Sequence, residues 1–279
     1  MFLIPVKFRT ASIVCIMMVF LAVGSYAQVP VLPNAYAHND YSHKRPLKDA
    51  LANGFTYVEA DVYLRKGKLI VAHILPMLKK NRTLEKLYLD PLLNHVQSSL
   101  AQQQQNPVNN CPLTLMIDIK SDAEETGKVL IEMLEKYQDM LTVYENGCTT
   151  FRNVTVVLTG HKPYELVKNQ QRRFVFIDED LEKAATDTTT DLYPIASCKY
   201  SRLLKWKGKG DIPEVELKKL EYFVIQAHNN GRKVRLWGSP ENKKVWSELL
   251  KCNVDLINTD KLVRLRKFLL SDIPELVNK

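Results

Sequence analysis

Four side chains in one stretch of the chain have the types and spacing needed to hold a cation and to transfer protons. Glu59 and Asp61 stand two residues apart in a β-prone run, residues 57–62, so their carboxylates point to the same face. Adjacent carboxylates repel each other unless a proton or a cation lies between them. Histidines stand at both ends of the surrounding stretch, His38 and His73. This combination indicates cation binding together with acid–base chemistry by imidazoles.

A second segment adds a third carboxylate and a lysine. Residues 113–120 form an apolar run that ends with Asp118 and Lys120, again two residues apart. Three carboxylates offer only oxygen ligands, which suits Mg²⁺ or Ca²⁺ and argues against zinc. We therefore expect one divalent cation, Mg²⁺ or Ca²⁺, held by Glu59, Asp61 and Asp118. A cation, a lysine and two histidines together fit a phosphate ester: charge stabilises the oxyanion, and the imidazoles act as base and acid.

Alternating strands and helices must position these side chains. The apolar pattern predicts eight strands, at residues 34–37, 57–62, 113–120, 154–158, 174–177, 192–196, 233–237 and 254–258. Helical spacing and end signals predict helices at residues 47–53, 124–137, 163–169, 213–229, 241–251 and 261–269. Eight such units in about 250 residues match a (β/α)8 TIM barrel. An open doubly wound sheet is the alternative, but no GxGxxG or Walker loop follows a strand.

The polar residues fall where a barrel builds its active site, at the C-terminal ends of the strands. Besides the residues already named, Trp237 ends the seventh predicted strand and Asp260 follows the eighth. A grouping of acids and imidazoles on one rim indicates a functional site rather than chance. Arg235 shares a strand face with Trp237, so it would point into the barrel and need a carboxylate partner. We expect Asp260 to cap the helix that begins near residue 261.

The N-terminus has the features of a secretory signal. Lys7 and Arg9 precede an apolar run of about 14 residues, and small residues follow at 25–27. We expect residues 1–27 to be cleaved and residues 28–279 to form a single domain in a secreted or periplasmic protein, without stable membrane insertion. Cleavage would lower the formal net charge from +8 to +6, because the segment carries two basic residues and no acid. A scattered, mildly basic surface does not predict nucleic-acid binding.

Four cysteines remain after the predicted cleavage: Cys111, Cys148, Cys198 and Cys252. Export would place them where disulfides form. Cys111 and Cys148 each precede a predicted strand, so a bridge between them is compatible with neighbouring strands. Four cysteines allow three pairings, and the sequence does not choose among them.

Together these motifs resemble the phosphatidylinositol phospholipase C-like phosphodiesterase superfamily. The resemblance rests on residues 38–73, on the strand that ends in Asp118 and Lys120, and on residues 233–260 with Trp237. Within the superfamily it points to the glycerophosphodiester phosphodiesterase branch, including its bacterial exported members. It covers nearly all of the predicted mature chain.

The resemblance implies a role for each matching residue. His38 and His73 would be the catalytic acid and base, and the three carboxylates would hold one cation. Lys120 would touch the phosphate and Trp237 would line the pocket of the substrate, a glycerophosphodiester or a related lipid-derived or polymeric phosphodiester. Asn39 does not match the family motif, and it either contacts the substrate or shapes its loop. His38 is followed here by Asn39 and Asp40 where the branch has Arg-Gly, and Asp118 replaces the more usual Glu. These departures leave the fold and the metal site as expected, but the glycerol diester does not follow from them.

Two other functions are compatible with such a barrel. A glycosidase would use a pair of acids at catalytic separation and would need no metal. A non-catalytic ligand-binding barrel is the other alternative, and it gives no reason for keeping both His38 and His73.

Overall fold

The computed structural model describes residues 29–74, 79–103, 112–187, 189 and 191–271. The chain divides into two compact units, Met1–Pro30 and Val31–Lys279, and the fold described below is that of the second unit. The predicted signal segment, residues 1–27, and Cys111 lie outside the described residues.

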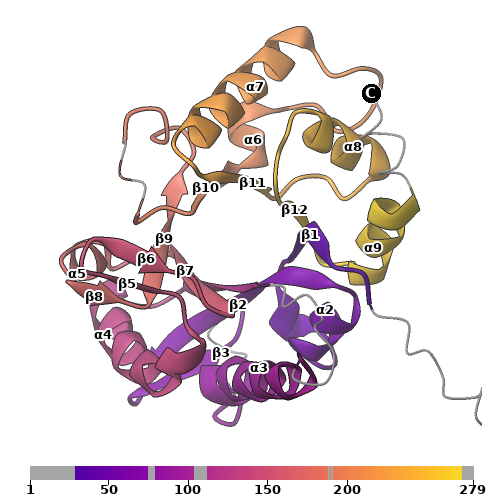
Figure 1. Cartoon of the computed structure of the whole chain (residues 1–279). Helices are drawn as coiled ribbons and strands as arrows, with labels where there is room; N and C mark the ends of the chain where they lie inside the picture. The colour runs from indigo at the N-terminus through magenta and orange to yellow at the C-terminus, as the bar shows by residue number, and fades with distance from the viewer. Residues whose placement is uncertain (1–28, 75–78, 104–111, 188, 190, 272–279) are drawn as a thin grey trace, which may run out of the picture. The chain divides into compact units, whose positions relative to one another are not determined.

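The second unit is a nearly closed barrel of eight parallel strands (Figure 1), which confirms the predicted (β/α)8 fold. In spatial order the strands are β11 (Lys233–Trp237), β10 (Ile195–Lys199), β9 (Val175–Asp180), β7 (Val154–Gly160), β4 (Leu113–Ile119), β2 (Phe55–Arg65), β1 (Leu32–Ala37) and β12 (Ile257–Thr259). A single bridge between Arg235 and Leu256 joins the two ends of this order. Each of the eight strands overlaps a predicted strand, although β10 and β12 each begin three residues later than predicted.

Helices cover the outside of the ring (Figure 1). They are α2 (Lys48–Ala52), α3 (Asp90–Gln103), α4 (Ala123–Leu134), α5 (Tyr164–Lys168), α6 (Tyr200–Leu203), α7 (Glu214–Asn229), α8 (Lys243–Lys251) and α9 (Leu262–Ser271). Short turns of helix η2 (Asp40–Ser42), η4 (Glu85–Leu89) and η5 (Glu135–Met140) complete them. Two helices have side-chain N-caps: the side chains of Asp122 and Asn242 accept from the backbone N–H of Glu125 and Val245. The apolar pattern did not predict η4, α3 or α6.

Two small additions extend the barrel. Strand β3 (Lys68–Val71) forms an antiparallel hairpin with β2. A separate three-stranded sheet of β6 (Cys148–Thr150), β5 (Val143–Glu145) and β8 (Arg172–Arg173) was not predicted. None of the helices in the described part of the chain combines the length and apolar character needed to cross a membrane. Cys148, Cys198 and Cys252 are free thiols, the latter two buried.

The barrel interior is closed by a cluster of buried apolar side chains. Its members come from strands around the ring and are Tyr36, Met116, Val157, Phe176, Ile195 and Leu256. Because side chains alternate along a strand, the residue two positions after each of these also faces inward. Met116 is therefore followed on the inner face by Asp118, and Phe176 by Asp178. The apolar cluster thus forms the floor on which a polar layer rests at the C-terminal ends of the strands.

Candidate active site

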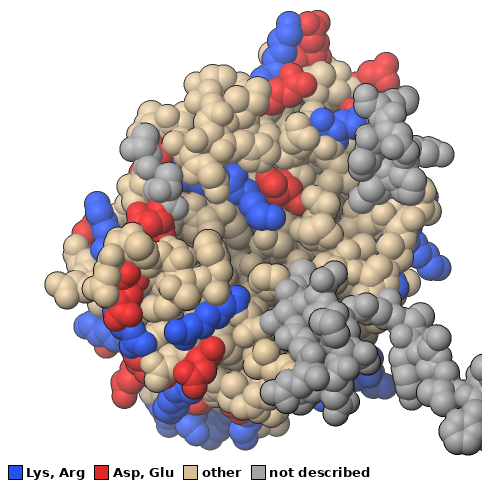
Figure 2. All heavy atoms as spheres, viewed as in Figure 1, with Lys and Arg blue, Asp and Glu red and all other residues tan. Residues whose placement is uncertain are grey.

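A cavity of about 460 Å³ opens at the C-terminal ends of the strands. Figure 2 shows the hollow in the centre of this face, with basic and acidic side chains on its wall. Seven of the eight residues that the sequence nominates line it: His38, Asn39, Glu59, His73, Asp118, Lys120 and Trp237. The eighth, Asp61, is only 1% exposed and lies beneath Tyr41 and Lys120. The barrel therefore brings the predicted site residues together.

Glu59, Asp61 and Asp118 form a carboxylate triad whose ligand atoms lie within 4.8 Å of one another. Strand register produces this grouping, because Asp61 on β2 is paired directly with Asp118 on β4. One oxygen of each carboxylate is engaged by the protein. Tyr36 Oη (2.5 Å) donates to Glu59 Oε2, Tyr41 Oη (2.8 Å) to Asp61 Oδ2, and Lys120 Nζ (2.6 Å) to Asp118 Oδ2.

The other oxygens of the triad lack protein donors. Asp61 Oδ1 and Asp118 Oδ1 are buried and have no hydrogen-bond partner among the described residues. Glu59 Oε1 has His38 Nε2 at 3.8 Å. A buried acceptor without a donor is costly, so such atoms usually mark a ligand or an ion. Three convergent carboxylate oxygens fit a hard divalent cation.

Burial raises the pKa values of Asp61 and Asp118, as expected for carboxylates held close together without a cation. The pKa of Asp61 rises to about 6, because the carboxylate is desolvated and Glu59 lies beside it, while Lys120 opposes the rise. Burial also raises the pKa of Asp118, against the hydrogen bond from Lys120. The pKa of Lys120 is raised as well, since its contacts with Asp118 and Asp61 outweigh desolvation. A bound cation would remove the cost of holding these carboxylates ionised together.

Gly160, at the end of β7, leaves space beside the triad. A Cβ atom at this position would lie 2.1 Å from Asp118 Oδ1 and 2.6 Å from the carbonyl oxygen of Ile119. The backbone is also left-handed there, with φ of +72°. Only glycine tolerates both conditions, so the bare backbone of Gly160 is what allows the Asp118 carboxylate to keep its place. Sequence analysis did not single out this residue.

His38 is held by a carboxylate from the far end of the chain. Its Nδ1 lies 2.7 Å from Oδ1 of Asp260, and Asn39 Nδ2 lies within 3.3 Å of the same oxygen. Since a carboxylate can only accept, Nδ1 carries the proton and Nε2 faces Glu59 and the cavity. Burial opposes protonation, but the bond to Asp260 and the charge of Glu59 raise the pKa of His38. The prediction for Asp260 was wrong: it orients His38, and α9 begins two residues later, at Leu262.

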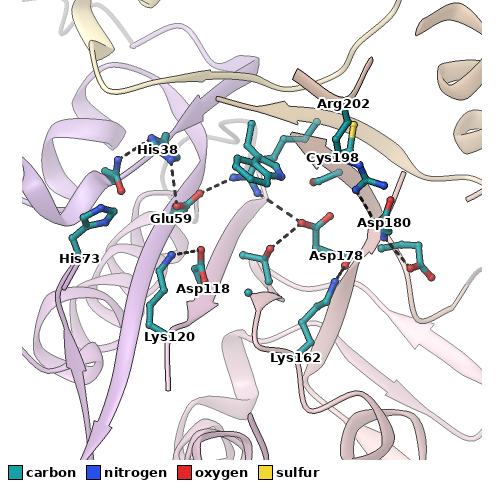
Figure 3. Close-up of a pocket in the computed structure, with 17 residues that line it drawn as sticks. His38, Glu59, His73, Asp118, Lys120, Lys162, Asp178, Asp180, Cys198 and Arg202 are labelled. Carbon is teal, nitrogen blue, oxygen red and sulfur yellow. Dashed lines mark hydrogen bonds and ion pairs between the residues drawn. The ribbon is translucent and has the colours of Figure 1, made fainter. Parts of the chain in front are cut away.

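His73 contacts Asp61 of the triad, whereas His38 lies beside Glu59. Its Nδ1 is 3.0 Å from the Tyr41 hydroxyl and 3.2 Å from Asp61 Oδ2, and its side chain is 60% exposed. In Figure 3 both histidines lie on the side of the pocket that holds Glu59. The two imidazoles thus flank the triad, His38 partly buried and His73 open to solvent.

Arg235 pairs with a carboxylate, as its position on the strand predicts. Its guanidinium is buried, stacks on the Tyr36 ring at 4.2 Å, and donates to Glu59 Oε2 at 2.9 Å. A second carboxylate, Asp178 on β9, lies 3.7 Å away. The sequence predicts that Arg235 needs a carboxylate partner, but it does not identify Glu59 or Asp178. Asp178 was missed because the strand was predicted to end at the preceding residue.

Comparison with known proteins shows the family. Residues 27–178 match the family model of the AIM6-like phosphodiesterase domain. A protein named Altered inheritance of mitochondria protein 6, from Eremothecium gossypii, is 31% identical over 86% of this chain and 70% of its own length. The protein of the same name from Saccharomyces cerevisiae strain S288c is 30% identical over 81% of this chain and 68% of its own length.

Two solved structures are similar at the level of the chain trace. The glycerophosphodiester phosphodiesterase of Agrobacterium tumefaciens covers 85% of this chain and 99% of its own, with a TM-score of 0.47 and 11% identity. The phosphatidylinositol-specific phospholipase C of Listeria monocytogenes covers 83% and 96%, with a TM-score of 0.39 and 11% identity. Both of these relatives identified by sequence are fungal, which corrects the expectation of a bacterial branch. The chain belongs to the family of the AIM6-like phosphodiesterase domain.

Proposed function

We propose that this chain is a phosphoric diester hydrolase that uses one divalent cation, Mg²⁺ or Ca²⁺, at the carboxylate triad. The observation that carries the proposal is the pair of buried, unpartnered oxygens, Asp61 Oδ1 and Asp118 Oδ1, beside Glu59 Oε1. The family of phosphodiesterase domains to which the chain belongs supports the same reaction class. When bound, the cation would stabilise negative charge on the phosphate oxygens.

The other side chains of the site transfer protons or stabilise charge on the phosphate. His38 Nε2 takes the proton of the attacking hydroxyl group or water, and Asp260 stabilises the imidazolium that forms. His73, which contacts Asp61, gives a proton to the leaving alcohol. Lys120, whose ammonium group already bridges Asp118 and Asp61, contacts the phosphate and adds positive charge. Asn39 holds the His38–Asp260 pair in place.

For the substrate we propose a glycerophosphodiester or a related lipid-derived phosphodiester. The attacking group is either water or a neighbouring hydroxyl of the substrate, and the second route gives a cyclic phosphate. Trp237, 41% exposed at the rim, would contact the alcohol. The resemblance in sequence supports this substrate. Comparison of glycerophosphocholine with a generic phosphodiester tests the substrate separately from the reaction class.

The experiment is hydrolysis of bis-(4-nitrophenyl) phosphate and glycerophosphocholine after chelation, and again with Mg²⁺ or Ca²⁺ restored. We expect turnover only with the cation, and its loss in His38→Ala and Glu59→Gln. His95→Ala on α3 and Glu132→Gln on α4 are matched controls, because both side chains are exposed and lie outside the cavity. Undiminished turnover after chelation would overturn the metal-dependent mechanism. Cleavage of 4-nitrophenyl glycosides in place of phosphodiesters would favour the glycosidase alternative.

We also propose that the protein is exported and that residues 1–27 are removed. The support is the pattern of two basic residues, an apolar run and small residues in this segment. N-terminal sequencing of the protein recovered from the extracellular or periplasmic fraction should begin near Gln28. Recovery of the intact chain from inside the cell would contradict the proposal.

A further inference from the structure

Tyr41 is a buried side chain beside the carboxylate triad, and the proposed reaction gives it no part. Its hydroxyl group lies within hydrogen-bond distance of three neighbours: Asn39 Oδ1 at 2.5 Å, Asp61 Oδ2 at 2.8 Å and His73 Nδ1 at 3.0 Å. The residue is only 6% exposed, and its ring stacks on the His73 ring, with the centroids 6.5 Å apart. One hydroxyl group therefore joins a proposed metal ligand to a proposed acid.

The segment that carries Tyr41 is anchored independently of these contacts. Tyr41 belongs to η2, and its backbone carbonyl accepts from the Arg82 guanidinium at 2.5 Å. The neighbouring Asp40 is fully buried, and its Oδ2 accepts from the backbone N–H of Leu47 at 2.5 Å and from the Tyr88 hydroxyl at 2.9 Å. Hydrogen bonds to a buried carboxylate are strong, so they fix the course of the loop. The position of the Tyr41 hydroxyl group therefore does not depend on His73.

His73, in contrast, has little else to hold its ring. Its side chain is 60% exposed and follows the last residue of β3 by two positions. Apart from Tyr41, its hydrogen-bond partner among the described residues is Asp61 Oδ2, at the longer distance of 3.2 Å. An exposed imidazole with one long hydrogen bond would turn freely and exchange its tautomers. The contact with Tyr41 is thus the main restraint on the ring.

A count of protons assigns the donor in each of these contacts. A hydroxyl group has one proton, and the amide oxygen of Asn39 and the carboxylate oxygen of Asp61 can only accept it. Burial and the neighbouring Asp61 raise the pKa of Tyr41, so the hydroxyl group keeps this proton and shares it between the two oxygens. His73 Nδ1 must therefore be the donor in its contact with Tyr41. The neutral ring then carries its proton on Nδ1 and a lone pair on Nε2.

We propose that Tyr41 is the positioning residue of the general acid, because its hydroxyl group holds the Nδ1 proton of His73 and leaves Nε2 for the reaction. As the P–O bond breaks, its electron pair goes to the leaving oxygen, which takes the proton from Nε2 of the imidazolium. Nδ1 keeps its proton in the bond to Tyr41, so the ring ends neutral. His73 lines the cavity in which this transfer would occur. The inference rests on the proposed phosphodiesterase function.

The kinetic test uses Tyr41→Phe, which keeps the ring and removes the hydroxyl group. Turnover is measured at saturating Mg²⁺ or Ca²⁺ on two diesters with different leaving groups, bis-(4-nitrophenyl) phosphate and diphenyl phosphate. Nitrophenolate leaves without a proton, whereas phenolate is a stronger base and needs the acid. Tyr41→Phe should therefore lower kcat about 10- to 100-fold on diphenyl phosphate but less than about threefold on the nitrophenyl diester. His73→Ala should show the same pattern, and adding Tyr41→Phe to it should cause no further loss.

Tyr137→Phe is a matched control for lost stability. Tyr137, on η5, is 7% exposed and donates to Asp90 Oδ1 at 2.6 Å, outside the cavity. Both substitutions remove a buried tyrosine hydroxyl that is bonded to a carboxylate, so both should lower the urea midpoint by a similar amount. Only Tyr41→Phe should change the ratio of the kcat values on the two diesters.

Nitrogen-15 NMR of histidine-labelled protein with Mg²⁺ tests the contact without turnover. At a pH where His73 is neutral, the wild type should carry the ring proton on Nδ1. In Tyr41→Phe the form with the proton on Nε2 should gain population. His73→Gln identifies the signal by its loss.

An equal loss of kcat on both diesters in Tyr41→Phe, or a His73 proton that stays on Nδ1 in that variant, would overturn the assignment. A wild-type ring with its proton on Nε2 would do so as well, and this spectrum decides the question if Tyr41→Phe does not fold. The expected change of tautomer without any turnover by the wild type would keep the contact and reject the proposed enzyme. Turnover with an unchanged ratio of kcat values in Tyr41→Phe would do the reverse.

Discussion

Gly160→Ala should weaken cation binding by moving the Asp118 carboxylate, although residue 160 is not itself a ligand. The new methyl carbon would lie 2.1 Å from Asp118 Oδ1, far inside van der Waals contact, and 2.6 Å from a backbone carbonyl oxygen that cannot move freely. The Asp118 side chain must therefore move, and the oxygen that has no protein partner moves with it. Displacing a ligand in this way typically costs about 10- to 100-fold in metal affinity.

The chain contains a matched control for the backbone part of this change. Gly147, in the turn between β5 and β6, has φ of +79° and would place a Cβ with no atom within 4 Å. Gly147→Ala should therefore cost only the strain of a left-handed alanine, about 1 to 2 kcal/mol of unfolding free energy. Gly160→Ala carries the same strain together with the overlap at Asp118, which adds about 1 to 3 kcal/mol.

The assay is calorimetric titration of both variants with Mg²⁺ and Ca²⁺, together with urea unfolding of the metal-free proteins. We expect Gly147→Ala to bind the cation as the wild type does, and Gly160→Ala to bind it at least about tenfold more weakly. If the two variants bind the cation equally well while only Gly160→Ala loses the additional stability, Asp118 is not a ligand. That result would refute the placement of the cation.

Three further predictions follow from the same site. The pKa of Asp61 is raised to about 6 without metal, so its proton competes with the cation at low pH. The affinity of the triad for the cation should therefore fall about tenfold from pH 7 to pH 5. A calorimetric titration that gives the same cation affinity at both pH values would contradict this. Asp260→Asn removes the carboxylate charge that helps to raise the pKa of His38, so the acidic limb of the pH–rate profile should move to lower pH. Arg235→Met breaks a buried ion pair and should cost about 3 to 5 kcal/mol in urea unfolding, against less than about 1 kcal/mol for the exposed Arg45→Met.

The sequence was sufficient to locate the parts of the site that depend on local pattern. Side-chain alternation puts Glu59 and Asp61 on one face, and the alternation of strands and helices puts both on the rim of a barrel. The structure adds the strand register that places Asp61 beside Asp118, which no local pattern specifies. Local sequence patterns therefore identify the three carboxylates, whereas the short distances between them depend on the pairing of β2 with β4.

The residues that were missed depend on contacts between distant segments. Polar residues at the ends of β9 and β10 look like loop, so the predicted strands stopped at residues 177 and 196, just before Asp178 and Ser197. Pairing of Ser197 with both neighbouring strands extends the ladder past that point. Asp260 has the sequence context of a helix cap, and its position 222 residues away from His38 hides their hydrogen bond. Closure of the barrel brings such partners together. The sequence predicts the barrel architecture but not these individual contacts.

Charge balance in the polar layer explains why a divalent ion fits better than a monovalent one. The ion-pair network that includes the triad holds four carboxylates, Glu59, Asp61, Asp118 and Asp178, and two cationic side chains, Arg235 and Lys120. With every group ionised, the sum is two negative charges in a site shielded from water. In the metal-free protein, protons must supply part of the missing charge, which is why burial raises the pKa values of Asp61, Asp118 and Asp178. One divalent cation brings the sum over these six side chains to zero, whereas a monovalent ion would leave one negative charge uncompensated.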